Sequence, residues 1–135
     1  MKKIVSTISL LLCLAVVVFS APLEPASLTC EYLHNPLGID TKTPRFSWTL
    51  KASERNQLQS AYEIIVSADR FDINQNHGDV WSSGKVMAST STQVEYAGKP
   101  LASFTRYFWK VKVYTQQGES SGWSNFNSFE TAMLD

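Results

Sequence analysis

The segment from residue 106 to residue 114 most constrains how this chain can fold. Its side chains alternate with a period of two, which places successive residues on opposite faces of an extended strand. One face consists of Tyr107, Trp109, Val111 and Val113. The opposite face consists of Arg106, Phe108, Lys110, Lys112 and Tyr114. This aromatic and β-branched pattern predicts a strand whose first face is buried and whose second face is partly wet.

Six further segments have the composition of short strands and are separated by polar stretches or by Gly and Pro. They span residues 28–33, 45–50, 61–68, 80–86, 92–96 and 123–131. Besides the apolar face of 106–114, the expected core contains Phe46, Trp48, Tyr62, Ile64 and Val66. No window after residue 20 has the apolar spacing of a helix, so almost no helix is expected. The pattern predicts an all-β fold, a seven-stranded antiparallel two-sheet sandwich of the fibronectin type III or immunoglobulin type.

Two local features refine this prediction. Tyr107 stands at the start of the most apolar strand. Two-sheet sandwiches carry a tyrosine there whose hydroxyl bonds to the backbone a few residues upstream, and a plain core role is the alternative. Phe126 and Phe129 are three residues apart, which breaks the period of two and indicates a bulge or a change of facing.

The first twenty residues have the layout of a secretory signal peptide. Met1 is followed by two lysines and then by an apolar run without charges that extends to residue 20. We expect cleavage before Ala21, an extended lead-in over residues 21–27 and the sandwich over residues 28–135. The protein is then exported, to the periplasm or the extracellular space, with no stable membrane span left. An uncleaved membrane anchor is the alternative.

Composition argues against several functional classes. The chain has 12 basic and 12 acidic side chains, and removal of residues 1–20 takes away two lysines, so no basic surface for nucleic acid is expected. Cys30 is then the only cysteine and is expected to be buried. Residues 72–79 begin like a calcium loop, but His77 stands where the bend requires glycine. No pattern of histidine, cysteine, serine or carboxylate residues predicts a catalytic, cofactor or metal site.

The outer face of the segment 106–114 is the best candidate for binding. It carries Phe108, Lys110, Lys112 and Tyr114, and Ala61 and Ile65 of a neighbouring strand are expected alongside. Such a surface is apolar enough to be a contact patch. Docking against another domain is the favoured interpretation, because interface cores are enriched in aromatic residues. Stacking on a sugar and the absence of any role are the alternatives.

Eight motifs follow one another along the chain. They are LTCEY from residue 28, NPLGID from 35, PRFSW from 44, QSAYEIIV from 59, GDVWSSGKV from 78, YFWKVKV from 107, SGWS from 121 and FET from 129. Taken together in this order, they resemble the amino-terminal module of secreted bacterial α-L-rhamnosidases. The resemblance covers nearly all of residues 28–135.

The resemblance implies a fibronectin type III-like sandwich that precedes further sandwich domains and a large helical barrel. In that family the barrel hydrolyses terminal α-L-rhamnose with acidic residues. The present sequence contains no barrel, so no catalytic residue is carried over, and we expect a non-catalytic accessory module whose partners are further domains of a rhamnosidase-like enzyme. An independent carbohydrate-binding or adhesion module with a polysaccharide partner is the alternative, and an inactive remnant is a third interpretation. A fragment, a truncated gene product and a free-standing module all stay open.

Overall fold

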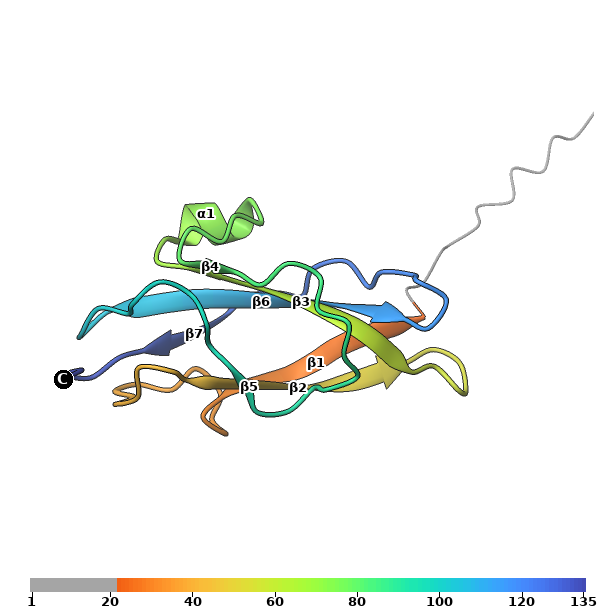
Figure 1. Cartoon of the computed structure of the whole chain (residues 1–135), viewed down its shortest axis with the longest axis horizontal. Helices are drawn as coiled ribbons and strands as arrows, with labels where there is room; N and C mark the ends of the chain where they lie inside the picture. Colours follow the sequence, from red (N-terminus) through yellow and green to blue (C-terminus); the bar gives the residue numbers. More distant parts are fainter. Residues whose placement is uncertain (1–21) are drawn as a thin grey trace, which may run out of the picture.

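The computed structural model describes residues 22–135, so the expected signal peptide and its cleavage site lie outside the described residues. Within this part of the chain, seven strands form two antiparallel sheets that face each other (Figure 1). The first sheet has the order β1-β2-β5 and consists of β1 (Leu23–Cys30), β2 (Arg45–Ala52) and β5 (Val94–Glu95). The second has the order β4-β3-β6-β7 and consists of β4 (Trp81–Ser82), β3 (Gln59–Ser67), β6 (Arg106–Thr115) and β7 (Asn127–Glu130). The predicted seven-stranded antiparallel sandwich is confirmed.

The core lies between the two sheets and is built mainly from alternate residues of β2, β3 and β6. The nine side chains predicted for it are all buried: Phe46, Trp48, Tyr62, Ile64, Val66, Tyr107, Trp109, Val111 and Val113. Phe46 of β2 reaches across to Trp109 of β6 and Phe129 of β7, with ring centroids 4.5 Å and 5.7 Å away. Because these rings come from both sheets, their packing holds the sheets face to face.

A tyrosine ties the β5–β6 connection to the core. The hydroxyl of Tyr107 accepts a hydrogen bond from the backbone N–H of Ala102 at 2.8 Å, while its ring stacks on Phe129. The predicted bond from the start of the sixth strand back to the upstream backbone is therefore confirmed. As a result, the end of this connection has a fixed position relative to β6.

The first strand differs from the prediction at both ends. β1 begins at Leu23, because residues 23–26 pair with residues 49–52 of β2, so most of the expected lead-in is part of the sheet. Ser27 has a φ of +49° and marks a bulge between Ala26 and Thr29. The strand ends at Cys30, because residues 31 and 32 adopt positive φ and turn the chain. This bulge carries no apolar signal in the sequence, which explains the shifted boundaries.

A short helix, α1 (Arg70–Asn74), follows β3, where the sequence predicts an irregular polar loop. The Asp69 carboxylate caps it by accepting hydrogen bonds from the backbone N–H groups of Phe71 and Asp72. The buried side chain of Ile73 anchors it against the sheet. A single turn is too short for the helical period to appear in the sequence. No helix in the described residues is long and apolar enough to cross a membrane.

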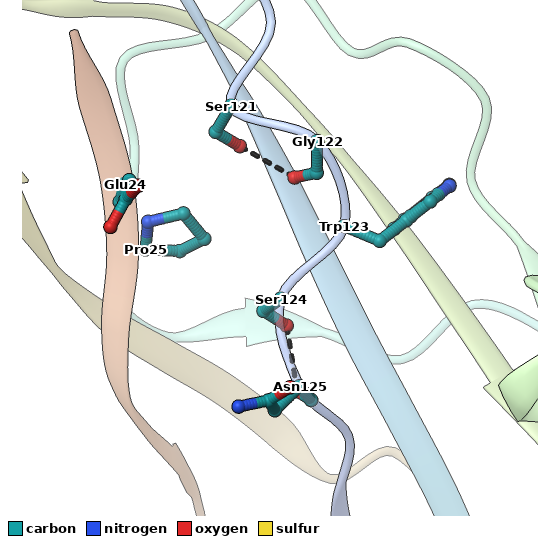
Figure 2. Close-up of a pocket in the computed structure, with 7 residues that line it drawn as sticks. All are labelled: Glu24, Pro25, Ser121, Gly122, Trp123, Ser124 and Asn125. Carbon is teal, nitrogen blue, oxygen red and sulfur yellow. Dashed lines mark hydrogen bonds between the residues drawn. The ribbon is translucent and has the colours of Figure 1, made fainter. Parts of the chain in front are cut away.

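The segment between β6 and β7 runs beside β6 (Figure 2) and pairs with it through two serines. The Ser121 hydroxyl accepts from the N–H of Val113 at 3.0 Å, and the Ser121 N–H donates to the Val113 carbonyl at 2.9 Å. Ser124 makes the same two bonds with Val111, at 3.1 Å and 2.9 Å. The side chains thus continue the edge of the sheet where no regular strand is present.

The two phenylalanines of the last segment lie on opposite sides of the sheet. Phe126 packs edge-on against Phe108 on the outer face, whereas Phe129 belongs to the core. Phe126 precedes β7, and β7 pairs with β6 without a register shift. Side chains three residues apart face opposite sides of a regularly alternating strand, so within β7 neither a bulge nor a change of facing is needed to place the two rings.

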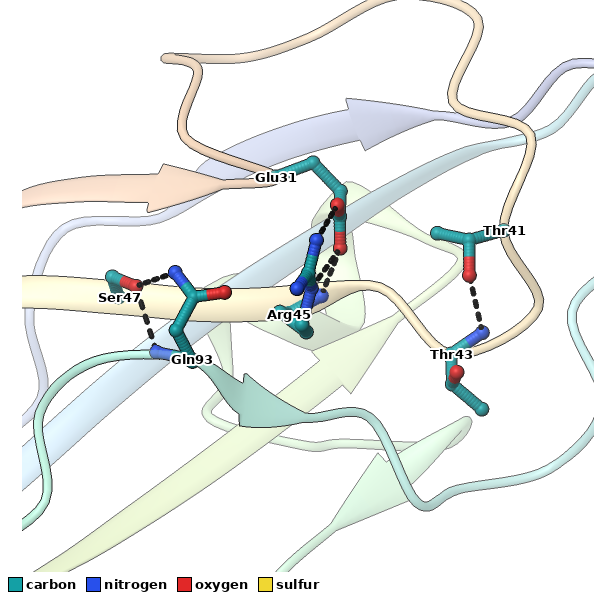
Figure 3. Close-up of polar contacts among 6 residues, drawn as sticks. All are labelled: Glu31, Thr41, Thr43, Arg45, Ser47 and Gln93. Carbon is teal, nitrogen blue, oxygen red and sulfur yellow. Dashed lines mark hydrogen bonds and ion pairs between the residues drawn. The ribbon is translucent and has the colours of Figure 1, made fainter.

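An ion pair fixes the connection between β1 and β2 (Figure 3). Glu31 accepts hydrogen bonds from Nε and Nη2 of Arg45 at 3.1 Å and 2.8 Å, and from the Arg45 backbone N–H at 2.7 Å. The Arg45 guanidinium also lies over the ring of Tyr32. Hydrogen bonds from the Arg45 side chain hold the pKa of the Glu31 carboxyl below its usual value, against the opposing effect of partial burial. Next to this pair, the Gln93 N–H donates to the Ser47 hydroxyl at 3.0 Å and ties β2 to the start of β5.

Replacing Trp109 with alanine should lower the free energy of unfolding by about 3–5 kcal/mol, as for other buried large aromatic residues. Trp109→Phe is the matched control. It keeps a ring in the core and removes an indole N–H that lacks a hydrogen-bond partner in the described residues, so its cost should be much smaller. Urea unfolding followed by circular dichroism measures both variants. A loss below about 1 kcal/mol for Trp109→Ala would show that this ring is not buried.

Glu31→Gln should lower stability at neutral pH and lose its effect in acid. The folded-state pKa of Glu31 is lowered, so its contribution is present above the unfolded-state pKa and is lost as the pH falls through the folded-state pKa. Urea titrations of both proteins between about pH 3 and pH 7 measure the difference. The difference in the free energy of unfolding between the two proteins should be largest near neutral pH and vanish at the acid end. A difference that stays constant over this range would mean that the carboxylate charge contributes nothing.

Candidate functional site

The four residues predicted as a contact face lie together on the outer side of β6, but their surroundings differ from the prediction. Lys110 is only 9% exposed, its Nζ donates to Asn76 Oδ1 at 3.0 Å, and burial lowers its pKa. Ala61 and Ile65 lie beside β6 as expected, yet both are buried. The expected exposed patch is therefore wrong at these three positions. At Lys110 and Ile65 the residues that follow α1 cover the sheet, because Asn76 binds Lys110 and Gly78 lies against Ile65.

Lys112 and Tyr114 form a ladder of cations and rings with neighbouring strands. Lys112 Nζ lies 3.4 Å from the Glu63 carboxylate and 4.4 Å from the centroid of the Trp123 ring. The Tyr114 hydroxyl donates to Glu63 at 3.1 Å, and Lys85 Nζ lies 4.2 Å from the centroid of its ring. Such contacts stabilise the outer face from within the chain. The role of this face in contact with another domain stays a prediction.

A polar hollow separates β1 from the segment between β6 and β7 (Figure 2). Its lining consists of Glu24, Pro25, Ser121, Gly122, Trp123, Ser124 and Asn125. The indole of Trp123 points away from Glu24 and Pro25, and Lys112 lies over it. Sugar recognition by stacking needs a free aromatic face, and this hollow presents small polar groups in its place.

Exposed apolar side chains also lie on three segments at the end of the sandwich where the chain leaves the last strand. Three come from different segments: Leu37 of the β1–β2 connection, Phe104 of the β5–β6 connection and Met133 after β7, with 72%, 71% and 64% of their surface exposed. We call these three residues the exit surface. Both connections and the carboxyl terminus lie at the same end of the molecule (Figure 1).

Backbone hydrogen bonds join the three segments of the exit surface. The N–H of Ala132 donates to the carbonyl of Ile39 at 2.8 Å, and its carbonyl accepts from the N–H of Phe104 at 3.1 Å. The Thr131 hydroxyl donates to the carbonyl of Ala102 at 2.6 Å, and the N–H of Leu134 donates to the Ser103 hydroxyl at 2.8 Å. The last residues after β7 are therefore held between the two connections.

The exit surface has no periodic pattern in the sequence. Leu37, Phe104 and Met133 lie in connections without a period of two, so nothing in the local pattern separates them from residues that turn inward. The hydrogen bonds that bring their segments together join residues far apart in the chain. The sequence offers one weak signal of this surface: Phe104 is an aromatic residue in a polar stretch, between Ser103 and Thr105.

The described residues offer little for catalysis or metal binding. They contain no group of three or more His, Cys, Asp or Glu side chains that could hold a metal ion. Burial, helped by the nearby charge of Glu31, raises the pKa of the Cys30 thiol to about 12, so the thiol is protonated at neutral pH and a poor nucleophile. The segment that begins like a calcium loop forms most of α1 and the turn after it.

A model of the family described as "Rha78A-like, N-terminal immunoglobulin domain" matches residues 25–135. Among curated relatives, an α-L-rhamnosidase of Formosa agariphila is 44% identical over 101 residues, which are 75% of this chain and 11% of the relative. An α-L-rhamnosidase of Streptomyces avermitilis is 40% identical over 112 residues, which are 83% of this chain and 11% of the relative. This chain thus spans a small part of the length of both relatives.

Solved structures also show similarity to α-L-rhamnosidases. The α-L-rhamnosidase of Dictyoglumus thermophilum superposes with a TM-score of 0.78 at 45% identity, over 81% of this chain and 12% of that chain. The Streptomyces avermitilis α-L-rhamnosidase, solved with L-rhamnose, gives a TM-score of 0.77 at 40% identity, over 82% of this chain and 10% of that chain. The resemblance drawn from the sequence motifs is confirmed. The chain belongs to the family of Rha78A-like amino-terminal immunoglobulin domains.

Proposed function

We propose that this chain is a non-catalytic module of a rhamnosidase-type enzyme and that it acts by packing against the domains that follow it. The proposal rests on a comparison of the length of this domain with the length of its relatives. The family model accounts for residues 25–135, whereas the matched region makes up only 11% of each of the two curated rhamnosidases. Most of such an enzyme, including its site for the sugar, then lies outside the region that this chain matches.

The hollows of the described structure support a non-catalytic role. Hydrolysis of a glycoside usually needs two carboxylates on either side of the bond that is cleaved. The hollow beside β1 offers one carboxylate, that of Glu24. The hollow near the carboxyl terminus contains Asp40 and Asp135, and both residues are exposed to solvent on an open surface. Neither arrangement encloses a sugar between two carboxylates.

The proposal includes export from the cytoplasm, to the periplasm or the extracellular space. Residues 1–20 combine two lysines with a long uncharged apolar run, which is the layout of a cleaved signal peptide. The single cysteine of the remaining chain, Cys30, is buried as a free thiol. The module therefore needs no disulfide in an oxidising compartment.

Two proteins test the proposal: the full chain expressed for export, and a chimera of the Streptomyces avermitilis rhamnosidase in which residues 23–135 replace the matching region. We expect the exported chain to begin at Ala21 by intact mass, to leave a nitrophenyl α-L-rhamnoside uncleaved and to give flat calorimetric titrations with rhamnose-bearing polysaccharide. The chimera should cleave the rhamnoside, and the module should unfold at a higher temperature in it than alone, because packing against other domains stabilises the folded state.

Other outcomes would contradict parts of this proposal. Cleavage of the rhamnoside by the isolated chain would show that the module is catalytic. Saturable binding of the polysaccharide would favour an independent carbohydrate-binding module. Equal unfolding temperatures of the module alone and in the chimera would show that it does not pack against the following domains. An intact mass that includes residues 1–20 would exclude cleavage of a signal peptide.

A further inference from the structure

We infer that the exit surface, formed by Leu37, Phe104 and Met133, is the contact surface for the domain that follows this module in a rhamnosidase-type chain. The inference rests on the proposed function and adds where the contact lies. Its competitor is the outer face of β6, where the sequence pattern places Phe108, Lys110, Lys112 and Tyr114.

Exposure favours the exit surface over the outer face of β6. The three side chains of the exit surface are about two thirds to three quarters exposed. On the outer face of β6, by contrast, Lys110 binds Asn76, and Lys112 contacts Glu63 and Trp123 of the same chain. Exposed apolar side chains on adjoining segments, beside polar residues, are typical of an interface. Here the polar rim consists of residues that line a hollow together with Met133, namely Asp40, Thr41, Lys42, Thr43 and Asp135.

The backbone of Phe104 is strained. Its φ is +52°, in the left-handed region that a bulky side chain rarely adopts. Asparagine or glycine would satisfy the turn at a lower cost, and the exposed ring gains little from burial in the module itself. A strained residue with an exposed aromatic ring therefore indicates a role outside the fold of this module.

The occupant of this surface is the domain that follows the module. The family is an amino-terminal domain and forms a small part of its relatives, so the remainder of those chains continues from its carboxyl end. That end passes through the exit surface, where its backbone is bonded on both sides to Ile39 and Phe104. A domain joined there is held at high effective concentration beside these side chains, and the firmly held exit restricts its orientation.

The variant Phe104→Asn separates docking from folding because the two effects have opposite signs. Asparagine tolerates the left-handed backbone, so the isolated chain should unfold at the same or a slightly higher temperature. In the chimera, loss of the ring should lower the unfolding temperature of the module by about 5 °C. Differential scanning calorimetry of both proteins, with and without the substitution, measures the shift.

Phe71→Asn is the matched control, because Phe71 is also 71% exposed but lies on α1, which covers the outer side of β3 and β6. We expect it to shift the unfolding temperature equally in the isolated chain and in the chimera. If Phe71→Asn weakens the chimera selectively and Phe104→Asn does not, the contact lies on the α1 and β6 side, and the inference is overturned.

Two further outcomes keep the inference distinct from the proposed function. If the unsubstituted module is stabilised in the chimera but Phe104→Asn leaves that stabilisation intact, the inference fails and the proposed packing stands. If the unsubstituted module gains no stability in the chimera, the proposed packing itself fails. Sedimentation of the isolated chain tests a second copy as the occupant: a dimer that Phe104→Asn dissociates would overturn the inference, and a monomer supports it.

Discussion

The contact between the rings of Trp109 and Phe46, 4.5 Å apart, joins one of the two inner strands of the four-stranded sheet to the central strand of the three-stranded sheet. Trp109 comes from β6, which pairs with β3 and β7, and Phe46 comes from β2, which pairs with β1 and β5. Once these two strands face each other, the rings of Phe129 and Tyr107 pack next to this pair. Tyr107 then fixes the β5–β6 connection through Ala102. The position of the exit surface is thus a consequence of how the core packs.

The pattern of β6 was predictable because burial on one face of a strand imposes a period of two over nearly its whole length. Phe46 and Trp48 in β2 and Ile64 and Val66 in β3 follow the same rule. α1 was not predictable, since one helical turn held by the Asp69 cap and the buried Ile73 leaves no periodic pattern. β4 and β5, with two residues each, are shorter than the segments expected for them because a composition rich in strand formers does not reveal how many residues find a partner strand.

Candidate binding residues were harder to predict than the core, because exposure depends on contacts between distant parts of the chain. Lys110 lies on the outer face of β6, as the alternation predicts, yet Asn76, 34 residues away, binds its amine and buries it. Conversely, Phe104 is exposed because a hydrogen bond from its backbone to Ala132 fixes a turn that points the ring outward. Motif resemblance identified the family where the physical pattern alone identified only the fold.

Amide hydrogen exchange tests most directly whether this module is an accessory domain that docks through its exit surface. The measurement compares the isolated chain with the same residues in the chimeric rhamnosidase. The account predicts slower exchange in the chimera at residues 36–39, 102–105 and 131–134, with unchanged exchange at residues 70–77. Slower exchange at residues 70–77, with no change around the exit surface, would contradict it.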